Sequence, residues 1–354
     1  MIALILIGGL GTRLRPFTCR TPKPLLPLLN KPFLQYQFDL LKAHGIRETV
    51  LCTSYRAEDF RKLDPKMTGV RLRFIHEKSP LGTGGAVKNA EGLLRGGEPV
   101  LIMNGDILHA LDIRGFLKSH QNRRAEVSIA LTRVKDPTLY GLVQTDESGR
   151  ITRFLEKPSW DEIESNTINA GAYIFEPQVL ELMPAGIPYS LERALFPKLL
   201  EDGRHVFGFV SQGYWMDIGT LESYLQVHLD ILGGKTPFAP RAASRKTGLL
   251  LEKGVKLGRE LTLGSNGDRV LVGRGTVIGD FARFSGNVCI GSQCRIGKGA
   301  LLSECVVLEG TIIGDGARLE RCLVGPGCRI GAQAVITQKT ALAGGSSVEP
   351  FSHL

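Results

Sequence analysis

Short apolar runs alternate with segments of helical period from the first residue to about position 232. Nearly every residue in the runs is apolar, which is typical of strands buried in a sheet. One segment between them, Phe33–His44, places Leu34, Phe38 and Leu41 on one side and stops at Gly45. The alternation predicts an α/β fold with a mainly parallel sheet covered by helices on both faces. The expected strands are IALILIGG, TVLCTSY, RLRFIHE, PVLIMNGD and VSIALTRV, and the further expected helices lie near Ala86–Leu94, Ile113–Asn122, Leu191–Glu201 and Leu221–Leu232.

The period changes in the last third of the chain. The stretch GGKTPFAPRAASRKTG, residues 233–248, has glycines, prolines and basic residues but no apolar period, so we expect it to be a linker. Beyond it, apolar residues recur every six positions, and most are followed at once by Gly or Ser. The ladder comprises Val272, Ile278, Phe284, Ile290, Ile296, Leu302 and Leu308, and continues with two five-residue steps through Ile313, Leu319, Val324, Ile330 and Ile336.

A six-residue period predicts a triangular coil. Each unit forms one side, its apolar residue points to the axis, and the small residue turns the corner. Glycine-rich loops, the alternative, would not keep an apolar phase. The repeat resembles the hexapeptide-repeat left-handed parallel β-helix, with about 4 coils if three units make one coil. The predicted organisation is an α/β domain over 1–232, a linker over 233–248, the β-helix over 249–341 and a tail over 342–354.

Composition and charge narrow the class of protein. A hydrophobic content of 43% is sufficient for a sizeable core, and the N-terminal stretch MIALILI is too short to span a bilayer. The seven cysteines contain no CxxC pair, so we expect reduced core residues in the cytoplasm, with zinc ligation as the alternative. The net charge of +9 is scattered singly, which favours small anionic substrates over nucleic acid. We therefore expect a cytoplasmic protein without a membrane or nucleic-acid partner.

The stretch GGLGTRLRPFTCRTPKPLLP, residues 8–27, directly follows the first predicted strand. Glycine lets an anion approach the backbone because no Cβ intervenes, so Gly8, Gly9, Gly11 and Thr12 are candidates for a phosphate-binding turn. The turn is not a Walker loop, since no GK[ST] follows, and it lacks the third glycine of a dinucleotide fingerprint. It is therefore a candidate cradle for a triphosphate.

Two cations follow this turn. Pro22 and Pro24 hold Lys23 in an extended stretch, so Arg13 and Lys23 are able to converge on one polyphosphate. The alternative for Arg13 is a cation on the surface, and the alternative for the two prolines is a rigid crossover between elements. Together, GGLGTRLRPFT and TPKPLLPLLNKP resemble the signature of the sugar-1-phosphate nucleotidyltransferases, the nucleoside-diphosphate-sugar pyrophosphorylases. The resemblance implies a Rossmann-like domain that condenses a sugar 1-phosphate with a nucleoside triphosphate, and the appended β-helix is an arrangement known in that family.

Further residues match the family in order along the chain. Asp106 ends the apolar run PVLIMNGD, at the edge where open α/β sheets bind ligands, and Asp217 lies in YWMDIGT. The resemblance implies that Asp106 and Asp217 hold Mg²⁺ and act with Arg13 and Lys23 in catalysis. A turn or a helix cap is the alternative for each aspartate. The sugar-phosphate positions that the resemblance implies are Gly141, Glu156, Lys157 and Asn169.

The loop HEKSPLGTGGAVKNA, residues 76–90, lies where the family reads the base. Uridylyl, thymidylyl and adenylyl relatives commonly carry a glutamine there, and this chain has none. The segments PLGTGGA, NKPFLQYQ, KDPTLYGLV and SLERALFP resemble GDP-mannose pyrophosphorylases, which implies GTP and mannose 1-phosphate as substrates, with Gly82 and Thr83 toward the guanine. A helix cap is the alternative for Thr83, and a heptose, glucose or another base stays open.

The implied reaction needs no protein nucleophile. A sugar 1-phosphate is already largely dianionic, since its second pKa is near ~6, so the expected mechanism is in-line attack on the α-phosphate with the charge neutralised by metal and cations. Arg13 and Lys23 would stabilise the departing pyrophosphate, and Lys157 would hold the sugar phosphate. The alternatives are a non-catalytic regulatory subunit and a CoA-dependent acyltransferase. No histidine lies between Leu229 and Ser352, which favours a structural β-helix, and homo-oligomers are expected through it or the catalytic domain.

Overall fold

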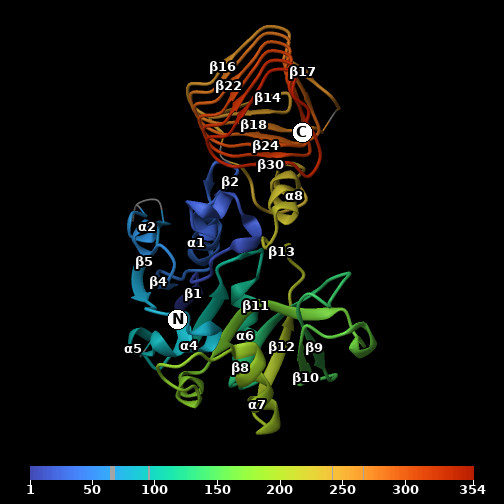
Figure 1. Ribbon diagram of the computed structural model, residues 1–354. Helices are drawn as coiled ribbons and strands as arrows, with labels where there is room; N and C mark the ends of the chain where they lie inside the picture. The colour runs from blue at the N-terminus through green and yellow to red at the C-terminus, as the bar shows by residue number, and fades with distance from the viewer. Residues whose placement is uncertain (64–67, 95, 241, 266) are drawn as a thin grey trace. The chain divides into compact units, whose positions relative to one another are not determined.

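The computed structural model describes residues 1–63, 68–94, 96–240, 242–265 and 267–354 (Figure 1). The chain forms two compact units. The first, the sheet unit, consists of Met1–Leu10 and Leu34–Trp215, and the second, the coil unit, consists of Gly11–Phe33 and Met216–Leu354. The loop that follows the first strand thus belongs to the unit that holds the repeats. The boundaries predicted from the change of period stay predictions.

A nine-stranded mixed sheet forms the centre of the sheet unit. Its strand order is β10-β9-β11-β6-β1-β4-β5, with β8 paired to β11 and β12 paired to β8. Strands β6, β1, β4 and β5 run parallel, whereas β11 is antiparallel to β6, β8 and β9. The α/β fold is confirmed, with an antiparallel half that the alternation did not indicate. The strands are β1 (Ile2–Leu6), β4 (Glu48–Thr53), β5 (Arg71–His76), β6 (Val100–Asn104), β8 (Val127–Arg133), β9 (Gly141–Thr145), β10 (Ile151–Glu156), β11 (Thr167–Phe175) and β12 (Val206–Val210).

The four parallel strands bring distant residues to one edge of this sheet. Gly8, Ser54, Glu77 and Gly105 follow β1, β4, β5 and β6 within two residues. The pairing continues past the end of β5, where the Glu77 N–H donates to the Thr53 carbonyl at 2.9 Å. Carboxyl ends of parallel strands are where open α/β sheets bind ligands. The predicted glycine turn, Asp106 and the predicted base loop therefore all start from this edge.

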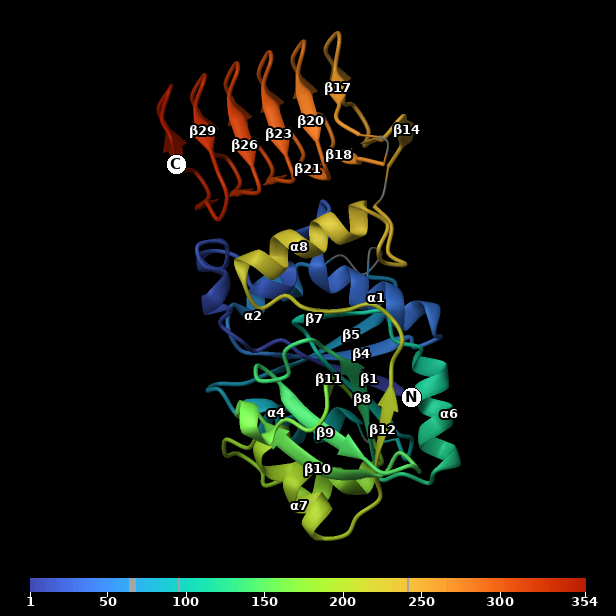
Figure 2. The same ribbon diagram turned by 90° about the vertical axis from the view of Figure 1, so that its right-hand side faces the viewer.

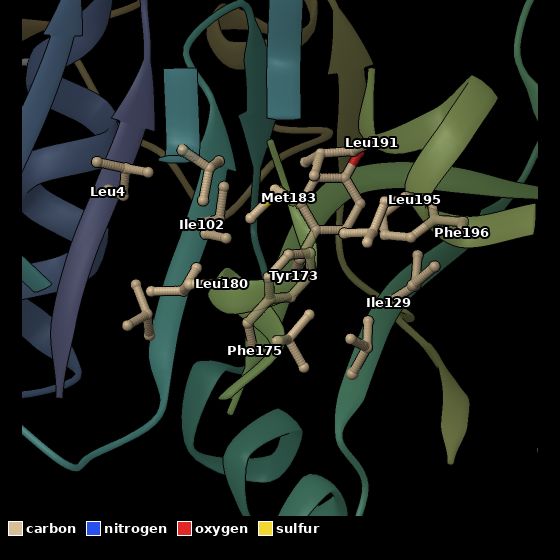
Figure 3. Close-up of a cluster of buried hydrophobic side chains, with 14 of the residues drawn as sticks. Leu4, Ile102, Ile129, Tyr173, Phe175, Leu180, Met183, Leu191, Leu195 and Phe196 are labelled. Carbon is tan, nitrogen blue, oxygen red and sulfur yellow. The ribbon is translucent and has the colours of Figure 1, made fainter. Parts of the chain in front are cut away.

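Helices cover both faces of the sheet. Alternate strand residues such as Leu4 and Ile102 pack with α4 and α7 in one buried cluster (Figure 3). Ile5 and Leu101 point the other way and are also fully buried, so the opposite face is covered as well. The helices predicted from periodicity are present, and Leu34 of α1 is buried as expected, but the predicted helix Ala86–Leu94 starts earlier and is divided into α4 and α5 at Ala90. The helices of this unit are α1 (Phe33–Ala43, whose first residue belongs to the coil unit), α2 (Ala57–Arg61), α4 (Gly82–Asn89), α5 (Glu91–Leu94), α6 (Ile113–Asn122) and α7 (Phe196–Glu201), which continues a π-helical turn at Leu191–Leu195.

Three stacks of short strands make up most of the coil unit (Figure 2). The sheets contain 7, 6 and 5 strands, all paired in parallel except for β14, which is antiparallel to β15. Two of the sheets contain six parallel strands each, and each of these strands belongs to a different coil. The expectation of about 4 coils was therefore too low. The sheets are β14 (Ser244–Lys246), β15 (Leu249–Leu251), β18 (Val270–Val272), β21 (Val288–Ile290), β24 (Val306–Val307), β27 (Leu323–Val324) and β30 (Ala341–Leu342); β16 (Lys256–Leu257), β19 (Val277–Ile278), β22 (Arg295–Ile296), β25 (Ile312–Ile313), β28 (Arg329–Ile330) and β31 (Ser347–Val348); and β17 (Thr262–Leu263), β20 (Arg283–Ser285), β23 (Leu301–Ser303), β26 (Arg318–Glu320) and β29 (Val335–Ile336).

The apolar ladder lines the inside of this stack. Its members are buried, and all except Leu308 belong to one core cluster. Leu308 is the exception because Val307, not Leu308, pairs with Ile290 in the neighbouring coil. The first five-residue step therefore lies one unit earlier than predicted. Glycine is required at the corners, since a Cβ added at Gly273 would lie 2.4 Å from a backbone atom of Gly291.

All seven cysteines are free thiols, and six of them are buried. Four of the buried ones, Cys294, Cys305, Cys322 and Cys328, belong to the core cluster of the coil unit. Among the described residues, no group of three His, Cys, Asp or Glu side chains could hold a metal ion. The expectation of cysteines that fill the core is confirmed.

Helix α8 (Leu221–Leu232) and the segment before α1 pack on the coils within the same unit. Asn287 donates through Nδ2 to the Leu229 carbonyl at 3.1 Å, and Asn30 donates to the Ile290 carbonyl at 3.1 Å. Tyr224 of α8 donates its hydroxyl proton to the Pro27 carbonyl. The loop that carries Arg13 and Lys23 is therefore anchored on the repeat structure.

Candidate functional site

The glycine turn begins in the sheet unit, directly after β1. Gly8 is tightly surrounded, since an added Cβ would lie 3.3 Å from Ser54 Cβ and 3.7 Å from Glu77 Oε1. Gly9 is exposed, and a Cβ there would meet nothing within 4 Å. Within the described part of the chain, the backbone N–H groups of Gly9 and Leu10 donate to no protein acceptor. These N–H groups are therefore available to an anion.

The rest of the turn lies in the coil unit and folds back on itself. Gly11 has a φ of 61°, and its carbonyl accepts the Thr18 hydroxyl proton at 2.7 Å. A Cβ added at Gly11 would lie 3.2 Å from Lys23 Cβ. One 3₁₀ turn then leaves Thr12 and Arg13 exposed to solvent. The turn thus places Gly11 against Lys23 and leaves the Arg13 side chain free to reach a ligand.

Three of the predicted catalytic residues come together in the coil unit. Lys23 Nζ lies 3.7 Å from Asp217 Oδ1, and the Lys23 side chain is only 9% exposed. A Cβ added at Gly219 would lie 2.8 Å from Arg13 Nη2 and 3.0 Å from Asp217 Oδ2, so the guanidinium and the carboxylate border the same small space. Two cations and one carboxylate at one place can bind a phosphate and a metal ion side by side.

Asp106 is held at the carboxyl end of β6 in the sheet unit. The preceding residue has to be glycine, because a Cβ at Gly105 would lie 2.2 Å from Ile7 Cγ2. Gln37 of α1, 2% exposed, donates through Nε2 to the carbonyls of Asn104 and Ile107, both at 2.9 Å. This side chain fixes the backbone on both sides of Asp106. Sequence reasoning missed Gln37, although a glutamine among the apolar residues of a helix was a visible signal.

The glycines of the base loop are required by a neighbouring segment. Gly82 has a φ of 70°, and a Cβ there would lie 2.8 Å from the Tyr189 carbonyl oxygen. Gly84 and Gly85 donate their N–H groups to that same carbonyl, at 2.9 and 3.0 Å. The N-terminal cap of α4 is Leu81, so the alternative interpretation of Thr83 as a cap is wrong.

A chain of hydrogen bonds joins the base loop to the predicted sugar-phosphate side. The Thr83 hydroxyl donates to Glu192 Oε2 at 2.6 Å, and the Tyr173 hydroxyl donates to Glu192 Oε1 at 3.3 Å. Asn169 Nδ2 in turn donates to the Tyr173 hydroxyl at 2.8 Å. The Thr83 hydroxyl therefore donates its proton to Glu192 and not to a ligand. Glu192 was not predicted, although it lies in the SLERALFP segment on which the resemblance rests.

Two side chains also hold the backbone of Ala170, the residue that follows Asn169. The Ala170 carbonyl accepts from His109 Nε2 at 2.6 Å and from Trp215 Nε1 at 3.0 Å. Burial lowers the pKa of His109 to about 4, so this histidine is neutral and carries its proton on Nε2. Both contacts hold the backbone of β11 where Asn169 projects.

Glu156 is the last residue of β10, and Lys157 follows it. Burial, and then the nearby Glu192 charge, raise the pKa of Glu156. Gly141 faces it closely, since an added Cβ would lie 3.1 Å from Glu156 Oε2. Lys157 is exposed and has a φ of 54°, and its N–H donates to the Tyr140 carbonyl at 3.0 Å. The left-handed backbone at Lys157 turns its side chain out of the strand pattern.

The chain matches models of known families and a solved structure. A family model described as "Nucleotidyl transferase" matches residues 2–233, and one described as "GMPPB C-terminal domain" matches residues 266–352. The crystal structure of HddC from Yersinia pseudotuberculosis in complex with GMP-PN is similar at a TM-score of 0.56 and 30% identity, covering 64% of this chain and 97% of that one. Within the described residues, no helix is long and apolar enough to cross a membrane.

Curated relatives extend over both units. A mannose-1-phosphate guanylyltransferase of Mycobacterium tuberculosis is 36% identical over 311 residues, which is 87% of this chain and 80% of that protein. Mannose-1-phosphate guanylyltransferase 1 of Arabidopsis thaliana is 35% identical over 319 residues, 88% of this chain and 82% of that protein. Since a family model covers residues 2–233 and these relatives cover most of the length, the chain belongs to the nucleotidyl transferase family and is similar to its mannose-1-phosphate guanylyltransferases.

Proposed function

We propose that this nucleotidyltransferase transfers a guanylyl group from GTP to mannose 1-phosphate, giving GDP-mannose and pyrophosphate. The observation that carries the proposal is the grouping of Arg13, Lys23 and Asp217 beside the glycine turn in a chain that is 36% identical to a mannose-1-phosphate guanylyltransferase. Such a group of charges suits a reaction between two phosphates. The choice of guanine is further supported by the GMP-PN complex of the similar HddC structure.

In the proposed reaction, a phosphate oxygen of the sugar 1-phosphate attacks the α-phosphorus of GTP. The new P–O bond forms as the bond from the α-phosphorus to the bridging oxygen breaks, and pyrophosphate leaves with that oxygen. Arg13 and Lys23 neutralise the charge on the departing pyrophosphate, and the N–H groups of Gly9 and Leu10 hold phosphate oxygens. On the sugar side, Lys157 neutralises the phosphate that attacks, while Gly141, Glu156 and Asn169 contact the sugar.

Nucleotidyltransferases of this family generally work with a divalent metal, and we propose Mg²⁺ for this one. The donors fit, because Asp106 and Asp217 offer hard carboxylate oxygens and Mg²⁺ commonly takes one or two carboxylates plus phosphate oxygens and water. When bound, the ion supplies charge neutralisation at the phosphates. Lys23 Nζ lies 3.7 Å from Asp217 Oδ1, so the two opposite charges attract and hold this carboxylate in place. That Asp106 and Asp217 share one ion stays a prediction.

A matrix of four nucleoside triphosphates against several sugar 1-phosphates, read by released pyrophosphate with and without EDTA, tests the proposal. We expect the highest kcat/KM for GTP with mannose 1-phosphate and no turnover in EDTA. Asp106→Asn should remove turnover and leave the unfolding temperature unchanged. Release of no pyrophosphate with any pair would instead favour a regulatory subunit, and a higher rate with a heptose or glucose phosphate would move the assignment of the sugar. A cytoplasmic homo-oligomer is also proposed, and sedimentation tests the assembly.

A further inference from the structure

A tight hairpin follows Lys23 in the coil unit. Its strands are β2 (Pro27–Leu28) and β3 (Lys31–Pro32), which pair antiparallel. The two residues between them, Leu29 and Asn30, have φ values of 49° and 63°. A two-residue turn of this kind needs left-handed backbone at both positions, which asparagine adopts more readily than most residues. The turn places the Asn30 side chain at the tip of the hairpin.

The tip of this hairpin contacts two coils at once. Asn30 Nδ2 donates to the Ile290 carbonyl at 3.1 Å and to Glu252 Oε1 at 3.3 Å. Ile290 is the last residue of β21, and Glu252 directly follows β15, so the two acceptors belong to strands that β18 separates. Glu252 is itself held, because its Oε2 accepts the Arg274 N–H at 3.0 Å. Both amide hydrogens of Asn30 thus join the hairpin to the stack of coils.

Lys23 is tied closely to this hairpin. It begins a 3₁₀ turn, and its carbonyl accepts the Leu26 N–H at 3.1 Å. The Leu26 carbonyl in turn accepts the Phe33 N–H at 2.9 Å, which closes the base of the hairpin. Pro22 and Pro24 restrict the backbone on both sides of Lys23. A displacement of the hairpin would therefore move Lys23 with it.

Asp217 is held by the same stack of coils. Helix α8 begins four residues after Asp217, and its Glu222 Oε1 accepts from Arg321 Nη2 at 3.3 Å. Arg321 Nη1 also donates to Glu304 Oε2 at 2.8 Å, which fixes the guanidinium on its own side of the stack. Figure 1 shows β2 and α8 beside the coils. The two members of the pair of Lys23 and Asp217 are therefore anchored separately on one stack.

We propose that Asn30 is a positioning residue for the proposed reaction, because its hydrogen bonds to the coils set the distance between Lys23 and Asp217. This inference rests on the proposed function, in which Lys23 neutralises the polyphosphate and Asp217 offers an oxygen to the metal. Lys23 Nζ and Asp217 Oδ1 are 3.7 Å apart, and a shift of about 1 Å in a reacting group can cost about 100-fold in rate. The coil unit thus takes part in catalysis through its hold on the hairpin.

An exchange of donor and acceptor tests this assignment. Asn30→Asp keeps the size of the side chain and the left-handed turn, but it places a carboxylate against Glu252 and the Ile290 carbonyl. The double variant Asn30→Asp with Glu252→Gln restores one hydrogen bond in the opposite direction, and Glu252→Gln alone completes the cycle. Asn122→Asp, at the exposed end of α6, is the control for the same change.

Calorimetric Kd values for GTP and steady-state kcat are measured on the full chain. We expect Asn30→Asp to bind GTP about 10-fold more weakly and to lose about 10- to 100-fold in kcat, while the control equals wild type. The double variant should recover most of both losses. A side chain that only stabilised the fold would lower the unfolding temperature and leave kcat of the folded protein unchanged.

Unfolding temperatures measured without ligand show which variants are folded. If Asn30→Asp does not fold, Asn30→Gly takes its place and should show the same losses, since glycine keeps the left-handed turn and removes the hydrogen bonds without adding a charge. Unchanged kcat in a folded Asn30 variant would overturn the inference, as would a double variant no better than Asn30→Asp. If wild type releases no pyrophosphate with any sugar phosphate, the proposed function fails, and the Kd values for GTP still decide whether Asn30 positions Lys23.

Discussion

The ammonium group of Lys23 lies 3.7 Å from the Asp217 carboxylate, although the two residues come from opposite ends of the nucleotidyltransferase segment. Their side chains are 9% and 20% exposed, so the attraction between them is weakly screened. The pair holds both side chains in place before substrate binds. The same pair contains one proposed ligand of the metal and one proposed ligand of the polyphosphate.

We expect Lys23→Met to lower kcat/KM for pyrophosphate release by about 100- to 1000-fold, since removing one preorganised charge from a reacting site commonly costs that much. The control is Lys198→Met, because Lys198 of α7 is exposed and its Nζ lies 3.0 Å from the carboxylate of Asp202, which follows the helix. Steady-state kinetics with GTP varied at saturating mannose 1-phosphate measure the difference. Equal rates for both variants would remove Lys23 from the reaction.

Gly9→Ala tests the phosphate cradle without disturbing the fold. An added Cβ at Gly9 meets nothing within 4 Å, so the unfolding temperature should not fall. A phosphate held by the backbone would still meet the methyl group, and KM for GTP should rise by at least about 10-fold. Gly92→Ala is the control, because Gly92 also has open space around it and lies in α5. An unchanged KM in Gly9→Ala would place the phosphates elsewhere.

Gln37→Leu should reduce both stability and turnover. The change preserves side-chain volume but removes the donor to two carbonyls that flank Asp106, and an unsatisfied buried carbonyl costs about 1–3 kcal/mol. Urea unfolding measures the first effect, and kcat of the folded protein measures the second. Gln121→Leu, on the exposed side of α6, is the control. Full kcat in a destabilised Gln37→Leu protein would mean that Asp106 is positioned without the two hydrogen bonds from Gln37.

His109 makes stability depend on pH. Its pKa in the folded protein is lowered by burial to about 4, whereas the unfolded chain has a value near 6.5. The unfolded state therefore binds more protons below pH 6.5, and the free energy of unfolding should fall by up to about 1.4 kcal/mol per pH unit between pH 6 and pH 5 from this group. His109→Gln should have a shallower slope in urea titrations over that window. Identical slopes would mean that His109 titrates normally.

Thiol labelling tests the core of the coil unit. Cys19 is exposed, and the other six cysteines are buried. Burial raises the pKa of Cys289 and Cys294 as well, which removes the reactive thiolate. We expect a disulfide reagent to modify one thiol rapidly in the native protein and all seven after unfolding. Cys19→Ser should abolish the rapid phase, and rapid modification of further thiols in that variant would contradict the packing described here.

Much of the fold could be predicted because the local pattern has one physical solution. Leu34 at a helical period on α1 and the six-residue ladder in the coils both have to be buried, and both are. The error at Leu308 arose because the sequence has two neighbouring valines and a leucine at 306–308, so periodicity alone did not fix the phase. Strand pairing did, by matching Val307 to Ile290.

The candidate site was predictable only as far as its residues stand in recognisable segments. Arg13, Lys23 and Asp217 were named from such segments, and the structure brings them together in the coil unit. Gln37 and Glu192 were missed because their functions depend on hydrogen bonds to residues distant in sequence. A single polar side chain on an apolar face does not indicate which carbonyl it will contact.

The sequence by itself determined the alternation of strands and helices and the inward positions of most of the ladder. These follow from the periodicity of apolar residues, which have to be buried. Only the tertiary structure decided that Glu77 would border Gly8, that Thr83 would donate to Glu192, and that the loop with Lys23 would be anchored on the coils. The reason is that strand order and packing between distant segments place these side chains, and neither leaves a local signal in the sequence.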